Sequence, residues 1–208
     1  MIFRLEVTGI EKLPSEGAFI LCPNHQSYLD PPVLLSTLPW KVYKRLFILG
    51  TSELFNQGML RRIAQTVQLF CVDSEAQTLP ALRIGCHGLR QGKALLLYPE
   101  GGISEDGVPK RFKVGAAVLA SRAKVPIFPV ALDGFHDAWP KDRGLRKLAK
   151  LTINVGDAVW LRNPESDREI DYEEITARLF HEFNTIWSEL QQRRFTALEQ
   201  IQPNKGVS

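Results

Sequence analysis

The chain has 208 residues, of which 44% are hydrophobic and 24% charged, a balance typical of one globular domain with a sizeable core. Its formal net charge of +3 is too small to indicate a nucleic-acid-binding protein, so no nucleic-acid partner is expected. The three cysteines are scattered, which predicts a reducing compartment with neither a disulfide framework nor a zinc site.

The sequence contains no obvious membrane or export segment. Residues 1–8 include Arg4 and Glu6 and no long apolar run, so no signal peptide is predicted. No stretch approaches the roughly 18–20 apolar residues that a membrane-spanning helix needs.

Short apolar runs alternate with helical patterns along the chain, and this alternation predicts α/β layering. The runs are rich in Val, Ile, Leu and Phe without strict alternation, as in strands that are buried on both faces. We therefore predict a single domain over residues 1–208, with a mixed, mostly parallel central sheet of about seven strands flanked by helices. The predicted strands are Ile2–Val7, Ala18–Cys22, Leu46–Leu49, Val67–Val72, Ala94–Tyr98, Ile127–Leu132 and Leu151–Val155.

Several helix ends carry recognisable signals. Asp30 before Pro31 resembles an N-cap, Gly92 resembles a C-terminal stop, and Asp171 with Glu174 has capping-box spacing. Residues 171–201 read as a C-terminal amphipathic helix, whose apolar side chains we interpret as a packing face rather than a membrane or partner contact. The predicted helices are Pro31–Leu38, Glu53–Ala64, Gln77–Gln91, Lys113–Ala123 and Tyr172–Glu199.

Residues 24–30 read Asn-His-Gln-Ser-Tyr-Leu-Asp and follow a predicted strand. Sites in parallel sheets gather at the carboxyl ends of strands. Asp30 can accept a hydrogen bond from one imidazole nitrogen of His25 and leave the other as a general base. Asn24 is expected to hold the turn rigid. A Cys22–His25 acyl-enzyme is the alternative, but the place of Cys22 within a strand favours burial.

A second block reads Pro99-Glu100-Gly101-Gly102 and also follows a predicted strand. The glycines allow close backbone approach, and consecutive N–H groups can form an anion-binding nest. Glu100 is expected to organise the pocket, with a structural salt bridge as the alternative. Downstream, Lys113 is the best candidate for a phosphate contact at a helix N-terminus, with Lys110 and Arg111 in reserve.

These two blocks, about 70 residues apart in this order, resemble the NHxxxxD and FPEGTR-like blocks of the glycerolipid acyltransferase family, of the bacterial lysophosphatidate acyltransferase type. The stretch Val125–Leu132 resembles the family's V-P-[IV]-x-P-V block. The resemblance runs from about Val7 to Val159 and implies a glycerol-3-phosphate acyltransferase-like fold. It also implies that His25 deprotonates an acceptor hydroxyl, and that no metal or organic cofactor is needed beyond the acyl thioester donor.

Two positions depart from the family pattern. Ile103 stands where the FPEGTR-like block has arginine, and Ser74 stands where a further arginine is expected. Neither side chain can imitate the bidentate phosphate contact of arginine. The acceptor is therefore open between lysophosphatidate, with Lys110, Arg111 and Lys113 replacing the lost charge, a lysophospholipid, and an alcohol without phosphate.

The resemblance implies transfer of a fatty acyl group from acyl-CoA or acyl-acyl carrier protein to the hydroxyl of a lysoglycerolipid. A thioesterase or lipid hydrolase using His25 and Asp30 is the first alternative, and a non-catalytic lipid-binding module is the second. We expect a cytoplasmic protein, peripheral on the inner face of the membrane, with a fused or partner ligase domain as a further expectation. Basic residues near Trp139 suit a membrane interface or a solvated loop: Lys141, Arg143, Arg146, Lys147 and Lys150.

Overall fold

The computed structural model describes residues 4–50, 68–71, 78–141, 144–145, 149–160 and 171–201. Within these residues, seven strands form one sheet in the order β1-β7-β6-β2-β5-β3-β4. The strands are β1 (Arg4–Thr8), β2 (Phe19–Pro23), β3 (Leu46–Gly50), β4 (Gln68–Cys71), β5 (Ala94–Leu96), β6 (Ile127–Asp133) and β7 (Lys150–Val155). Each of them overlaps a predicted strand.

The sheet is mixed and mostly parallel, as predicted. Its central strands β6, β2, β5, β3 and β4 run in one direction, and the only antiparallel pairing among the described strands joins β6 to β7. Strand β1 pairs in parallel with β7 and closes that edge. The register places Leu21 of β2 opposite Leu96, the last residue of β5, and β2 continues for two more residues to Pro23.

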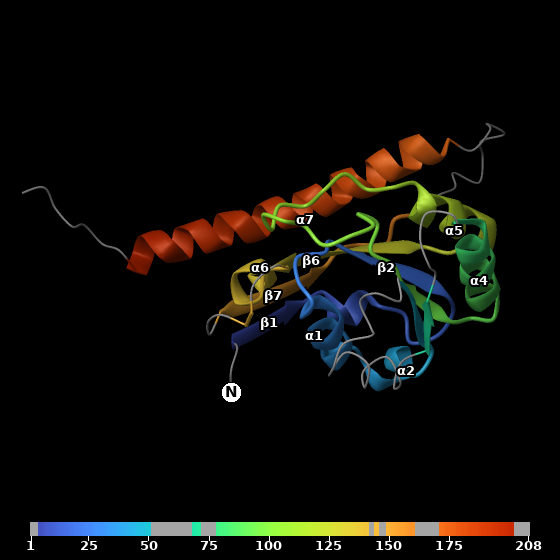
Figure 1. The fold of residues 1–208 in the computed structure, drawn as a ribbon, viewed down its shortest axis with the longest axis horizontal. Coiled ribbons are helices and arrows are strands. Elements are labelled where there is room, and N and C mark those ends of the chain that lie inside the picture. Colours follow the sequence, from blue (N-terminus) through green and yellow to red (C-terminus); the bar gives the residue numbers. More distant parts are fainter. Residues whose placement is uncertain are drawn as a thin grey trace, which may run out of the picture.

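Helices cover both faces of the sheet (Figure 1). In β2, Phe19 and Leu21 contribute to one buried cluster, whereas Ile20 and Cys22 contribute to the other. The first cluster packs against α1 (Asp30–Thr37), α2 (Trp40–Tyr43) and α6 (Phe135–Ala138). The second packs against α4 (Thr78–Arg90), α5 (Gly115–Ala123) and α7 (Tyr172–Ile201). This two-sided burial explains why the strand sequences lack strict alternation.

Four of the five predicted helices are present as α1, α4, α5 and α7, whereas the prediction for Glu53–Ala64 lies outside the described residues. The short helices α2 and α6 were not predicted, because four residues are too few to show a helical period. A 3₁₀ turn (Ile10–Lys12) follows β1. No helix in the described part of the chain is both long and apolar enough to cross a membrane.

Two of the predicted helix ends are confirmed. After α4, Gly92 has φ +79° and donates its N–H to Leu89 O, while Lys93 donates to Gly88 O. This is the pair of hydrogen bonds that a Schellman C-cap makes. Before α7, Oδ1 of Asp171 accepts the backbone N–H groups of Glu173 and Glu174.

The prediction that Asp30 is an N-cap is wrong. Leu29 occupies the cap position, makes no side-chain cap bond, and α1 begins at Asp30 itself. The Asp30 carboxylate points back to the preceding turn, where it accepts the N–H groups of Gln26 and Ser27. The Asp30 carboxylate therefore binds backbone N–H groups of the turn before α1, and not those of the first turn of the helix.

Helix α7 packs on the sheet through the predicted apolar face. Leu179, Phe183 and Leu190 are buried in the second cluster, with Ile186 and Trp187 packed against it. Near its C-terminal end, Arg194 forms ion pairs with Asp133 at the end of β6 and with Asp137 of α6. Figure 1 shows this end of α7 running past α6.

Candidate active site

The two motif blocks meet at the carboxyl ends of adjacent parallel strands. His25 is the second residue after Pro23, the last residue of β2, and Glu100 lies in the turn that follows β5. Because β2 and β5 are paired in parallel, both segments emerge at the same edge of the sheet. The backbone N–H of Ser104 donates to His25 O at 2.7 Å, which joins the two segments directly.

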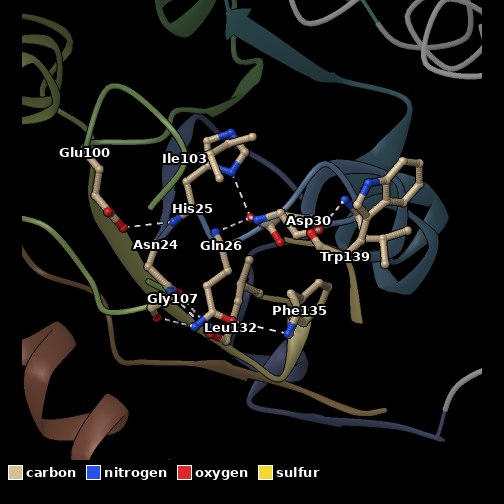
Figure 2. Close-up of polar contacts among 12 residues, drawn as sticks. Asn24, His25, Gln26, Asp30, Glu100, Ile103, Gly107, Leu132, Phe135 and Trp139 are labelled. Atoms are coloured by element: carbon tan, nitrogen blue, oxygen red, sulfur yellow. Dashed lines mark hydrogen bonds and ion pairs between the residues drawn. The ribbon is translucent and has the colours of Figure 1, made fainter. Parts of the chain in front are cut away.

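His25 and Asp30 form a buried hydrogen-bonded pair (Figure 2). Nδ1 of His25 lies 2.8 Å from Oδ2 of Asp30, and the two side chains are 4% and 0% exposed. Because a carboxylate accepts hydrogen bonds, it favours the tautomer with the proton on Nδ1. In this tautomer the lone pair of Nε2 is free to act as a base. No described residue forms a hydrogen bond with Nε2, so this nitrogen can accept a proton from a substrate.

The Asp30 carboxylate is held by backbone as well as by the imidazole. Oδ2 also accepts the N–H groups of Gln26 at 2.6 Å and Ser27 at 2.9 Å, whereas Oδ1 is buried with no partner among the described residues. Burial raises the pKa of Asp30, opposed by the hydrogen bond from His25 and by those two N–H groups. These backbone donors hold the carboxylate, which in turn holds the His25 imidazole.

Tyr98 covers one face of the His25 imidazole. The two ring centroids are 3.9 Å apart with an interplanar angle of 21°, which is a stacked arrangement. Burial, and secondly the charge of Asp30, raise the pKa of Tyr98 well above its ordinary value. The sequence reasoning missed this residue, although an aromatic side chain just before Pro99-Glu100 was an available signal.

Glu100 organises the site through backbone contacts and not through a side-chain salt bridge. Oε1 accepts the N–H of His25 and Oε2 accepts the N–H of Lys110, each at 2.9 Å. Burial raises the pKa of Glu100, opposed by these two N–H donors. Figure 2 shows the contact of the Glu100 carboxylate with the backbone N–H of His25. With the second bond to Lys110, one carboxylate holds the backbone of both segments.

Asn24 and Gln26 attach the histidine turn to neighbouring elements. The Asn24 amide donates to Leu132 O at 3.0 Å and accepts the Leu132 N–H at 2.7 Å, which holds the turn rigid against β6. The Gln26 amide donates to Gly107 O and accepts the N–H of Phe135. Gln26 was not singled out from the sequence, because a lone glutamine in a turn carries no pattern.

Two of the three candidate phosphate contacts, Lys113 and Lys110, touch the turn at residues 99–104 that follows β5. Lys113 donates its N–H to Pro99 O at 2.8 Å, and its ammonium covers Gly101, where a Cβ would lie 2.7 Å from Nζ. Gly101 has φ +73°, so glycine meets both a backbone and a space requirement there. Lys110 donates from Nζ to the carbonyl of Ile103 at 3.0 Å.

The remaining candidates are placed differently. The side chain of Arg111 is 89% exposed, and its guanidinium lies 3.8 Å from the Glu173 carboxylate of α7. Gly102 is exposed, with nothing within 4 Å of where a Cβ would stand. Ile103 is only 5% exposed and fills the arginine position with apolar surface. Ser74 lies outside the described residues.

The cysteine alternative receives no support from the structure. Cys22 is fully buried within β2, and burial raises the pKa of its thiol far above the ordinary value. A thiol in this state is a poor nucleophile. In the described part of the chain, no group of three or more His, Cys, Asp and Glu side chains could hold a metal ion.

Comparisons with known proteins place this geometry in context. A family model described as Acyltransferase matches residues 4–133. The 1-acyl-sn-glycerol-3-phosphate acyltransferase beta of Homo sapiens is 29% identical over 160 residues, covering 75% of this chain and 56% of the human protein. The 1-acyl-sn-glycerol-3-phosphate acyltransferase of Bacillus subtilis (strain 168) is 23% identical over 154 residues, covering 74% of this chain and 72% of that protein.

A solved structure shows the same fold. The 1-acyl-sn-glycerophosphate (LPA) acyltransferase PlsC from Thermotoga maritima matches with a TM-score of 0.71 at 24% identity, covering 90% of this chain and 72% of that one. The chain spans 56% of the human relative and 40% of the chloroplastic enzyme BAT2 of Brassica napus, about half the length of such relatives. The family match covers more than half of the chain and contains both motif blocks, so the chain belongs to the glycerolipid acyltransferase family.

Proposed function

We propose that this chain is an O-acyltransferase that moves a fatty acyl group from acyl-CoA or acyl-acyl carrier protein to the free hydroxyl of a lysoglycerolipid. The observation that carries the proposal is the buried His25–Asp30 pair, whose Nε2 is unengaged at the edge where Glu100 joins the two motif blocks. The names of the human and Bacillus subtilis relatives support a 1-acylglycerol-3-phosphate acceptor.

The chemistry follows from the pair. Nε2 of His25 takes the proton of the acceptor hydroxyl as its oxygen attacks the thioester carbonyl, and Asp30 stabilises the imidazolium that forms. Collapse of the tetrahedral intermediate breaks the carbon–sulfur bond, and the departing thiolate takes the proton from Nε2. The products are the acylated lipid and the free thiol, so no covalent enzyme intermediate is needed.

The Pro99–Ser104 turn is proposed to receive the polar part of the substrates. The N–H of Gly101 is already donated to Tyr98 O, which leaves Gly102 as the glycine N–H for an anion. Glu100 and Asn24 act on the same site through the backbone of the histidine turn. We therefore count Asn24, Glu100, Gly101 and Gly102 as the residues that shape the substrate site.

Lys113 is proposed as the principal phosphate contact, because its ammonium lies over this turn. Lys110 is the second candidate, since its ammonium already contacts the carbonyl of Ile103. Arg111 is the weakest of the three, because its guanidinium faces Glu173. If the two lysines replace the arginine that Ile103 displaces, lysophosphatidate remains an acceptor, and otherwise the acceptor is a lysophospholipid or an alcohol without phosphate.

Lipid substrates would bring the chain to a membrane surface. We propose peripheral association on the inner face of the cytoplasmic membrane, with the acyl thioester donor and the lysoglycerolipid as partners. A fused or partner ligase domain that supplies the thioester is a further proposal, and no nucleic-acid partner is proposed. Binding of the purified chain to vesicles with and without anionic lipid tests the membrane part of the proposal.

The activity is tested by incubating the purified chain with labelled acyl-CoA and, separately, with acyl-acyl carrier protein. The acceptors are lysophosphatidate, glycerol 3-phosphate and a set of lysophospholipids, and His25→Ala is the control. Transfer to lysophosphatidate that the variant lacks supports the lysine proposal, whereas transfer to lysophospholipids alone assigns a changed acceptor to Ile103. Loss of thioester without any acylated lipid would support the thioesterase alternative and contradict the proposal.

A further inference from the structure

The catalytic imidazole is held at one atom by Asp30 and over one face by Tyr98. The hydrogen bond from Nδ1 to Oδ2 fixes where that nitrogen lies, but a single bond leaves the ring free to tilt about it. The phenol ring of Tyr98, stacked at 3.9 Å, limits this tilt on one side. The plane of the imidazole, and therefore the direction of Nε2, depends on both contacts.

Tyr98 is itself fixed by the sheet and by the turn that follows it. The neighbouring Leu97 donates its N–H to Leu21 O at 3.0 Å, and Tyr98 O accepts the N–H of Gly101 at 3.2 Å. The backbone of Tyr98 is thus anchored to the strand that precedes His25 and to the turn that carries Glu100, and its side chain packs against the first buried cluster. A ring held in this way can act as a fixed platform.

The hydroxyl of Tyr98 does not explain the placement of its ring. It is buried and has no hydrogen-bond partner among the described residues, and such a hydroxyl is unfavourable for stability. A phenylalanine would fill the same ring position without that cost. The stacking of its ring on His25 is therefore the contact that accounts for an aromatic residue at position 98.

We propose that Tyr98 is a positioning residue for the base of the proposed acyl transfer, and that its ring face stabilises the imidazolium formed when His25 takes up the hydroxyl proton. An aromatic face attracts a cation more strongly than a neutral ring. The contact is therefore stronger in the transition state than in the ground state, which is the condition for lowering the barrier. The inference rests on the proposed function, since the imidazolium forms only if His25 is the base.

Two other titratable side chains contact His25. Asp30 accepts the N–H of its Nδ1, and Glu100 accepts its backbone N–H. Both are acidic, and the hydrogen bonds that hold them do not involve the Tyr98 side chain. A change caused by the loss of the aromatic face can therefore be separated from a change in these charges. Tyr98→Phe keeps the aromatic face, and Tyr98→Leu keeps apolar bulk without it.

The expected effect is kinetic and confined to variants without the ring. Tyr98→Leu should lower kcat about 3- to 30-fold, the range that a cation–π contact converts to, while KM for the acyl donor stays near the wild-type value. The acidic midpoint of its kcat/KM profile should move to lower pH, because the protonated imidazole has lost a stabilising contact. Tyr98→Phe should match the wild type in kcat and in pH profile.

The test uses the full chain, with wild type and His25→Ala measured first. If the wild type transfers the acyl group and His25→Ala does not, His25 is established as the base. If the wild type shows no transfer, the proposed function is refuted, whatever the role of Tyr98. Titration of ring-labelled histidines by NMR then gives a readout that needs no activity, with His25→Ala identifying the relevant signal. The His25 signal should titrate at lower pH in Tyr98→Leu than in the wild type, and without change in Tyr98→Phe.

Tyr98→Met serves as a second variant without the ring, in case the leucine variant does not fold, and thermal unfolding checks each protein. The inference is overturned if a folded Leu or Met variant keeps wild-type kcat and His25 titration. It is also overturned if Tyr98→Phe loses as much activity as they do, because the hydroxyl would then be the functional group.

Discussion

The carboxylate of Glu100 accepts the backbone N–H of His25 at 2.9 Å, across a separation of 75 residues in the sequence. Its other oxygen accepts the N–H of Lys110, so one buried side chain fixes the histidine turn and the turn after β5 in a single arrangement. The geometry of the proposed base therefore depends on a residue that never touches its imidazole.

Replacing Glu100 with glutamine should weaken both the fold and the activity. Glutamine offers one acceptor oxygen, and its NH₂ group would face an N–H group, so one backbone donor loses its partner. The expected cost is about 1.5–3 kcal/mol in the free energy of unfolding, with kcat/KM reduced at the same time. Denaturant unfolding and transfer assays measure the two effects. Glu105→Gln is the matched control, since Glu105 is exposed in the same segment, and equal behaviour of the two variants would contradict the assigned role.

The pH dependence of stability should report the buried carboxylate of Asp30. Its folded pKa is raised by burial, so the folded protein binds this proton more tightly than the unfolded chain does. The tighter binding of this proton adds to the free energy of unfolding. The added stability is fully present below the unfolded pKa of about 3.9, and it is lost as the pH rises through the raised pKa of Asp30 in the folded protein. In Asp30→Asn this ionisation is absent, so the variant should gain stability relative to wild type as the pH rises through that window. A difference that stays constant with pH would show that burial does not dominate at Asp30.

The two-bond contact between Asn24 and the Leu132 backbone should be sensitive to an isosteric change. Aspartate can still accept the Leu132 N–H, but its second oxygen would face the Leu132 carbonyl without a proton between them. Asn24→Asp should therefore lower the free energy of unfolding by about 1–3 kcal/mol. Asn184→Asp on α7 is the control, because Asn184 is only partly buried. Equal unfolding midpoints for the two variants would argue against the contact.

The ion pairs of Arg194 should contribute little to stability, and in a salt-dependent way. Arg194 is partly exposed and pairs with Asp133 and Asp137, while Gln191 also donates to Asp133. Arg194→Ala should cost about 0–1 kcal/mol at low salt and less at high salt, because solvent screens such pairs. Unfolding at two ionic strengths measures this, with Arg193→Ala for comparison. A large loss that salt leaves unchanged would point to packing of the side-chain stem instead.

Cys22 should be dispensable for chemistry. It is fully buried in β2, so Cys22→Ala is expected to retain acyl transfer while losing some stability from the smaller side chain. Transfer assays and thermal unfolding on the same preparation separate the two effects. Abolished transfer in a folded Cys22→Ala protein would revive an acyl-enzyme route.

The strands were predictable because burial on both faces requires continuous runs of apolar residues. Such runs can be recognised in the local sequence without knowing which strands pair. The turn at residues 24–30 was located from its position after such a run. Contacts across the sheet were not predictable, since nothing local indicates that Gln26 reaches Gly107 or that Tyr98 stacks on His25. Asp30 misled the helix assignment because its carboxylate serves the turn before the helix and not the helix end.

The basic residues show the same limit. Charge near the second block was visible in the sequence, but Lys113 and Arg111, two positions apart, point to different places. Only the fold of the turn shows that the ammonium of Lys113 covers Gly101, whereas the guanidinium of Arg111 faces α7.

In the proposed reaction His25 removes the proton from the acceptor hydroxyl, and the first measurement to make is kcat of the His25→Ala variant. We predict a loss of about 10²- to 10⁴-fold in transfer from the thioester to the lysoglycerolipid, with thermal unfolding showing a folded protein. A folded His25→Ala protein that transfers the acyl group at the wild-type rate would show that His25 is not the base.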